Sequence, residues 1–171
     1  MRLLIVILGL LLITGCTATS VGKKFDDSRN ESLAKKRVSA AYPELADANI
    51  RITSFEGIIL VTGQVPSAKF IPLVSAQIRP LRNVRKLHNE LIVAGEKTFL
   101  SGIDDSWLAT KVKAALSSEQ FSDTNRIKVV AYNGVIYLMG LVTRAEADIV
   151  VEEIQKIKGV QKIVKILEYM N

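Results

Sequence analysis

Hydrophobic and polar residues fall into blocks along the chain, and the first apolar block predicts a leader segment. A run from Leu3 to Leu12 follows a single cation, Arg2, and ends in Ile13-Thr14-Gly15-Cys16. The run is too short for a membrane-spanning helix, which needs about 20 apolar residues. A short basic start, an apolar core and small residues before a cleavage point are typical of a secretory signal peptide. We therefore expect residues 1–15 to be a signal peptide.

The next block is small, polar and charged, and it predicts a flexible linker. It runs from Thr17 to Asn30 and lacks the apolar periodicity of a packed element. Ser28 and Glu31 have the spacing of a capping box, which would open a helix that must stop by Pro43. We expect residues 16–27 to join the leader to the folded body.

Two later blocks are nearly the same pattern, displaced by 77 residues. The segment Ile50–Gly63 aligns with Ile127–Gly140, and each contains β-rich residues around a turn pair. Asn133-Gly134 is a strong hairpin signal, because both central positions of a type I′ turn need positive φ. Glu56-Gly57 is a weaker form of the same signal. The repetition indicates an internal duplication.

The segments around each hairpin repeat as well, so each copy reads helix–strand–strand–helix–strand. In the second copy a helix from Asp105 to Leu116 comes first, and Thr143 and Glu146 form a capping box for the next helix, which should end at Gly159. Other expected features are a buried stripe of Ile149, Val150, Ile154 and Ile157, last strands at 84–93 and 160–169, and a short helix from Pro72 to Arg79, limited by Pro80. The pattern predicts an α+β chain of two units, at 28–96 and 101–171, which pack on each other because each alone is small for a stable core.

Composition and charge limit the classes of molecule that this protein is expected to bind. The sequence has 49% hydrophobic residues, a formal net charge of +6 and one cysteine, so an intramolecular disulfide is impossible. Positive charge is concentrated in residues 17–100, with 13 Lys and Arg against 8 Asp and Glu, whereas residues 101–171 have 9 of each. An export signal argues against nucleic acid as the partner, whereas an anionic lipid surface agrees with both the signal and the charge.

No combination of residues predicts an enzyme, a metal site or a cofactor. The single histidine, His88, has no cysteine or second histidine to act with. Asp104-Asp105 is the one acidic pair that could suggest metal binding. Its position at a helix start favours capping instead. We expect a non-catalytic protein.

Two resemblances add to this interpretation. Ile13-Thr14-Gly15-Cys16 resembles the bacterial lipobox, which implies cleavage before Cys16, fatty acylation (diacylglycerol and palmitate) at that cysteine and, with Thr17 next, export to the outer membrane facing the periplasm. The helix–strand–strand–helix–strand order, the hairpin glycines and the Gly159-Val160 step resemble the BON domain. Two such domains behind a lipobox resemble a family of outer-membrane lipoproteins that contact anionic phospholipid near the division site and support envelope integrity.

The helix at 105–116 carries the candidate site. Its spacing directs Leu108, Val112 and Leu116 to the core and leaves Trp107 at the edge or outside. The resemblance implies phospholipid binding (phosphatidylglycerol or cardiolipin) by residues of this helix, with Ala114 and Ser117 as substituted contact positions: Trp107, Thr110, Lys111, Lys113, Ala114 and Ser117.

Three alternatives remain open at this point. Trp107 could pack against the other unit or the linker. A second cationic surface is formed by Arg79, Arg82, Arg85 and Lys86, which is either a solvated face or an electrostatic patch. The rival function is a periplasmic adaptor or holdase that assists the outer-membrane protein assembly machinery, with Trp107 as a protein contact.

Overall fold

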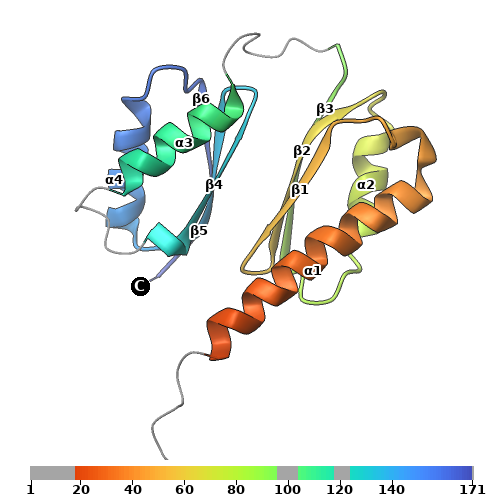
Figure 1. Cartoon of the computed structure of the whole chain (residues 1–171), viewed down its shortest axis with the longest axis horizontal. Helices are drawn as coiled ribbons and strands as arrows, with labels where there is room; N and C mark the ends of the chain where they lie inside the picture. Colours follow the sequence, from red (N-terminus) through yellow and green to blue (C-terminus); the bar gives the residue numbers. More distant parts are fainter. Residues whose placement is uncertain (1–17, 96–103, 118–123, 171) are drawn as a thin grey trace, which may run out of the picture.

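The computed structural model describes residues 18–95, 104–117 and 124–170, and they form two units that lie side by side (Figure 1). The first unit contains α1 (Ala18–Ala41), a 3-10 turn (Pro43–Leu45), β1 (Ile50–Phe55), β2 (Ile58–Val65), α2 (Phe70–Ile78) and β3 (Lys86–Val93). The second contains α3 (Asp105–Leu116), a 3-10 turn (Thr124–Arg126), β4 (Ile127–Tyr132), β5 (Val135–Val142), α4 (Arg144–Gln155) and β6 (Lys162–Tyr169). The predicted element order and the α+β class are confirmed.

Each unit has one three-stranded sheet with the hairpin at one side. The orders are β1-β2-β3 and β4-β5-β6, and in each the central strand is antiparallel to the first strand and parallel to the last. The turn pairs Glu56-Gly57 and Asn133-Gly134 have positive φ at both positions, as the sequence predicts. The repeat therefore extends from the sequence to the hydrogen-bond register.

A matched glycine in each central strand explains part of the repeated pattern. A Cβ at Gly63 would collide with the carbonyl oxygen of Asn49, and a Cβ at Gly140 with that of Arg126. Glycine at both positions allows the backbone before the hairpin to cross closely over the central strand.

One face of each sheet packs on its own helices. In the first unit Ile59 and Val61 share one core cluster with Val74 of α2 and Val38 of α1, and the equivalent core of the second unit contains Leu138 of β5. Helix α4 is fixed by the predicted capping box, in which Glu146 N donates to Thr143 Oγ1 and Thr143 N donates to Glu146 Oε2.

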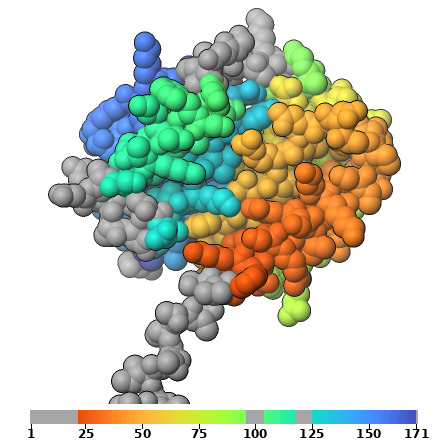
Figure 2. Space-filling model, viewed as in Figure 1, coloured from red at the N-terminus to blue at the C-terminus, as the bar shows by residue number. Residues whose placement is uncertain are grey.

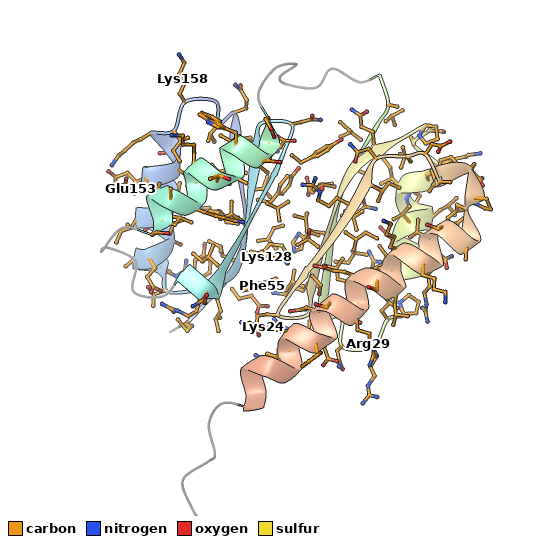
Figure 3. All side chains as sticks on the ribbon, in the orientation of Figure 1. Lys24, Arg29, Phe55, Lys128, Glu153 and Lys158 are labelled. Atoms are coloured by element: carbon orange, nitrogen blue, oxygen red, sulfur yellow. The ribbon has the colours of Figure 1, made fainter. Side chains whose placement is uncertain are left out.

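The other faces of the two sheets pack against each other. This third cluster combines Ile58 and Leu60 of β2 with Tyr137 and Met139 of β5 and Ile166 of β6. The molecule is thus layered as helices, sheet, sheet, helices, with Phe55 and Lys128 between the units (Figures 1 and 3). Packing of the units on each other, predicted from their size, is observed.

The two units run in opposite directions. Arg85, next to the turn of the first unit, binds Glu168 near the end of β6, with Arg85 Nη2 2.8 Å from Glu168 Oε2. Lys128 near the start of β4 donates to the carbonyl oxygen of Ser54 near the end of β1. The hairpin turn of one unit therefore lies beside the far strand ends of the other.

The predicted linker is helical, so this expectation is wrong. Helix α1 begins at Ala18, ten residues before the proposed capping residue Ser28. The reason is tertiary, because Asp26 and Asp27 bond to the body instead of remaining solvated. Asp27 accepts from Ser54 Oγ and from the backbone N–H of Glu56 and Gly57, and Glu31 accepts from Ser54 N instead of closing a capping box.

Smaller differences concern the other helices. Helix α2 runs from Phe70 to Ile78, not Pro72 to Arg79, and tolerates Pro72 because it lies in the first turn, where backbone N–H groups have no intrahelical partner. Helix α4 ends at Gln155, before Gly159. Ile149, predicted to be buried, is 38% exposed.

Candidate functional site

The acidic pair at the start of α3 has a structural role. Asp104 caps the helix, its Oδ1 accepting from Ser106 N at 2.7 Å. Asp105 accepts from the backbone N–H groups of Asn133 and Gly134, at 3.0 and 3.2 Å, and so fastens the helix to the hairpin turn. The capping role predicted for this pair is observed at Asp104. Together with the hydrogen bonds of Asp105, it fixes the start of α3 to its own unit.

Helix α3 has a buried side and an outward side. Leu108, Val112 and Leu116 are buried against the sheet, as predicted. At 100° per residue the opposite arc of about 160° contains every residue assigned to the candidate site. All of them are exposed: Trp107, Thr110, Lys111, Lys113, Ala114 and Ser117.

Trp107 is the dominant side chain of this outward side. It is 46% exposed, and the Nζ atom of Lys111 lies 5.6 Å from the centre of its ring. Because α3 lies on the face of its sheet opposite the first unit (Figure 1), the predicted exposure of Trp107 is confirmed. The indole and the ammonium group together form an amphipathic surface with one apolar and one cationic part.

The two hydroxyl groups of the site bond within the helix. Thr110 Oγ1 donates to the carbonyl oxygen of Ser106 and Ser117 Oγ to that of Lys113, both at 2.8 Å. Because these hydroxyl protons are engaged within the helix, the charged donors that remain for an outside partner are the ammonium groups of Lys111 and Lys113. This arrangement suits a partner with anionic acceptor oxygens, such as phosphate esters.

The second predicted cationic surface is divided by the contact between the units. Arg85 and Lys86 both bind Glu168, with Nζ of Lys86 2.8 Å from its Oε1. These two cations lower the pKa of Glu168 to about 2, mainly through hydrogen bonds. Only Arg79 and Arg82 of the four remain as exposed cations without such a partner in the described chain, so a continuous patch does not form.

Sequence reasoning missed Asp27, which it placed in the linker. Asp27 Oδ1 lies 3.0 Å from Gly57 N, and its place in the first unit is that of Asp105 in the second. The two residues are 78 positions apart, close to the hairpin displacement, so extending the repeat alignment further toward the N-terminus would have found it.

The remaining candidate features lie apart from helix α3. His88 lies half-buried on β3, and the described ranges contain no cluster of three or more potential metal-binding side chains. None of the helices in these ranges is both long and apolar enough to cross a bilayer. Cys16 and the predicted signal peptide lie outside the described residues.

A match to a protein-family model shows which family the chain belongs to. The BON domain model matches residues 26–95 and 104–171, which correspond to the two units. The chain belongs to the BON domain family. It is 28% identical over 152 residues to the outer membrane lipoprotein DolP of Haemophilus influenzae, which covers 89% of this chain and 79% of that protein.

Two further similarities are weaker guides. A 21 kDa hemolysin of Actinobacillus pleuropneumoniae is also 28% identical, over 88% of this BON protein and 78% of the relative. Among solved structures, the C-terminal domain of CdsD, a type III secretion system protein of Chlamydia trachomatis, matches with 19% identity and a TM-score of 0.33, covering 85% of this chain and 67% of the other. A TM-score this low supports no statement about domain arrangement or function.

Proposed function

We propose that this protein is an outer-membrane lipoprotein, anchored through Cys16, that binds anionic phospholipid through the outward side of α3. The lipobox-like sequence before Cys16 and the similarity to a relative named an outer membrane lipoprotein support the anchor and its location facing the periplasm. The half-exposed Trp107 beside Lys111 is the observation that carries the lipid-binding part. Support of envelope integrity, and action near the division site, would follow from holding this surface at the membrane.

The free energy of membrane binding should come mainly from the indole of Trp107 and less from the charges of the helix. Each lysine near an anionic leaflet contributes about 1 kcal/mol, and Asp104 at the helix start offsets part of that. Trp is suited to the membrane interface because its ring is apolar and its N–H can still reach water or a headgroup. A lipid anchor raises the effective concentration of the body at the bilayer, so weak insertion is sufficient.

Vesicle co-sedimentation tests the proposal. The body without residues 1–16 should bind vesicles of phosphatidylglycerol more strongly than vesicles of phosphatidylcholine, and Trp107→Glu should abolish this preference. Leu73→Glu is the matched control, because Leu73 is exposed on α2 of the other unit and is not part of the candidate site. Unchanged binding by the Trp107→Glu protein would refute lipid contact through α3.

The anchor has its own test. Mass spectrometry of the exported protein should find Cys16 as the N-terminal residue with diacylglyceryl and acyl groups attached. An unmodified thiol would contradict the anchor and leave the lipid-binding surface to be judged by co-sedimentation.

The adaptor or holdase alternative receives less support. A holdase needs a continuous apolar surface, whereas the large exposed hydrophobic side chains of the described chain come from six different elements: Phe25, Leu73, Trp107, Leu141, Ile149 and Tyr169. Failure of the wild-type body to bind either vesicle would favour the adaptor, with Trp107 contacting a protein instead of lipid.

A further inference from the structure

Helix α1 separates its charges between two sides. Its carboxylates turn toward the body, where Asp27 accepts from the hairpin turn, Asp26 from the side chain of Asn83, and Glu31 from Ser54 N. These hydrogen bonds hold the negatively charged groups of the helix on the side that faces the body. The negative groups that could neutralise the outward side are therefore already engaged.

Several cations of α1 are turned away from the body, whereas Lys23 pairs with Glu56 and Lys24 lies beside the second unit. Figure 3 shows the side chain of Arg29 extending away from the body. Within the described part of the chain, five exposed cations of this helix form no ion pair: Lys24, Arg29, Lys35, Lys36 and Arg37. At 100° per residue, Arg29 and Lys36 lie near the centre of the outward side and Lys35 at its edge, so this side presents positive charge between residues 29 and 36.

An aromatic side chain lies at the beginning of this cationic surface. Phe25 is 73% exposed, and at 100° per residue it projects opposite to the buried Ala34 and on the same side as Arg29 and Lys36. Bulky apolar residues combined with Lys and Arg are the composition of helices that lie in a membrane interface. Phe25 belongs to none of the three hydrophobic clusters of the described body, so burial in lipid would stabilise it.

The position of α1 makes a membrane contact geometrically reasonable. Helix α1 begins two residues after Cys16, and Figure 2 shows α1 and α3 on the same face of the molecule. Because the units run in opposite directions, the starts of the two helices lie at opposite ends of that face. Tethering at the start of α1 would keep this helix close to the bilayer.

We propose that the outward side of α1, from Phe25 to Lys36, is a second membrane-contact surface that binds anionic phospholipid headgroups. The inference depends on the lipid anchor of the proposed function but not on the identity of Trp107 as a lipid contact. This proposal gives the excess positive charge of the first unit a role in binding the membrane through α1.

Fluorescence quenching by brominated lipid tests both helices separately in the full-length acylated protein. The wild-type chain has one tryptophan, so quenching by brominated phosphatidylglycerol reports on α3. Phe25→Trp in a Trp107→Phe background reports on α1, and Leu73→Trp in the same background is the control on α2. We expect the indole at position 25 to be quenched at least twofold more than the indole at position 73.

The outcomes distinguish the two proposals. Quenching at 107 but not at 25 overturns the α1 surface and leaves α3 intact, whereas quenching at 25 but not at 107 supports α1 and overturns the contact through α3. Equal quenching at 25 and 73 also overturns the α1 surface, because anchoring alone would then explain proximity to lipid.

A charge comparison identifies the headgroup contribution. Replacing Arg29, Lys35 and Lys36 together by Gln should reduce quenching at position 25 to the level found in brominated phosphatidylcholine. Replacing Lys158, Lys162 and Lys165 by Gln changes the net charge equally, on exposed sites of the second unit, and should leave quenching unchanged. Equal losses in both triple variants would contradict a local headgroup contact on α1.

Discussion

Asp27 and Asp105 hold the same position in the two units, each accepting backbone hydrogen bonds from the turn of its own hairpin. Asp27 Oδ2 lies 2.8 Å from Glu56 N, and Asp105 Oδ2 lies 3.0 Å from Asn133 N. In both units the first helix is thereby fixed to the turn, although one aspartate lies inside a long helix and the other begins a shorter one.

Asp27→Ala should destabilise the first unit. It removes the acceptor for two backbone N–H groups and for Ser54 Oγ, and hydrogen bonds to charged groups contribute about 1.5–3 kcal/mol each. Because water can partly replace the acceptor, we expect a loss of about 2–3 kcal/mol in the free energy of unfolding, measured by urea denaturation. Asp26→Ala, which loses one exposed bond to Asn83, should cost less than 1 kcal/mol; equal losses would refute the anchoring role of Asp27.

Asn30→Leu should stabilise the protein. Asn30 is 1% exposed, and within the described residues its Nδ2 atom has no hydrogen-bond partner. Leu108 occupies the equivalent position of the second unit and is fully buried. Removing an unsatisfied amide should add about 1 kcal/mol, observed as a higher denaturation midpoint.

The reverse substitution, Leu108→Asn, provides the comparison for this prediction. It should cost about 3 kcal/mol, because it leaves a polar group without a partner in an apolar core. A lower midpoint for Asn30→Leu would show that Asn30 makes a favourable interaction that the geometry does not reveal.

Glu168 should make stability depend on pH. Arg85 and Lys86 lower its pKa from 4.5 to about 2 in the folded protein, so its contribution is fully present above the unfolded pKa and is lost as the pH falls toward 2. The shift corresponds to at most about 3 kcal/mol, and solvent screening at the half-exposed cations reduces the expected effect to about 1 kcal/mol.

Unfolding of the Glu168→Gln protein tests this contribution. Compared with wild type, the variant should lose about 1 kcal/mol at pH 7 and almost nothing at pH 2. Glu152→Gln, on an exposed face of α4, should behave like wild type at both values. A constant difference between Glu168→Gln and wild type over the whole range would indicate a loss of packing, not of charge.

Met139→Ala should weaken the contact between the sheets. Met139 is fully buried in the shared cluster with Leu60 and Ile58, and Met-to-Ala changes in cores cost about 2–5 kcal/mol. Leu141→Ala is the control on the same side of the same strand, because Leu141 is exposed, and it should cost less than 1 kcal/mol. Similar losses in urea denaturation would mean that the sheet contact contributes little.

Local and repeated patterns explain why most of the fold was predictable. The turn pair Asn133-Gly134 requires positive φ and therefore fixed the hairpin, and the capping box at Thr143 fixed the start of α4. Trp107 was placed outside the core because the helical period directs Leu108, Val112 and Leu116 toward the sheet and leaves Trp107 off that side. Each of these predictions depends on residues close together in the sequence.

The features that were missed depend on contacts distant in sequence. The segment before Ser28 is polar and reads as a linker, yet Asp27 reaches a turn 30 residues away and extends the helix. Arg85 and Lys86 were grouped with Arg79 and Arg82 because a list of cations does not reveal Glu168, which is 83 residues from Arg85. Ile149 was grouped with the apolar stripe of α4, but at 100° per residue it lies 100° from Val150 and 140° from Ile154, so it projects away from the buried side.

The face shared by the two sheets contains equivalent residues from both units, since Ile58 corresponds to Val135 and Leu60 to Tyr137. Such self-complementary burial is the rule in twofold homodimers, and here both halves belong to one polypeptide. Either half expressed alone would expose this apolar surface and would be expected to pair with a second copy of itself. The covalent link therefore replaces an association that would otherwise depend on concentration, and it allows one half to diverge without its partner changing in step.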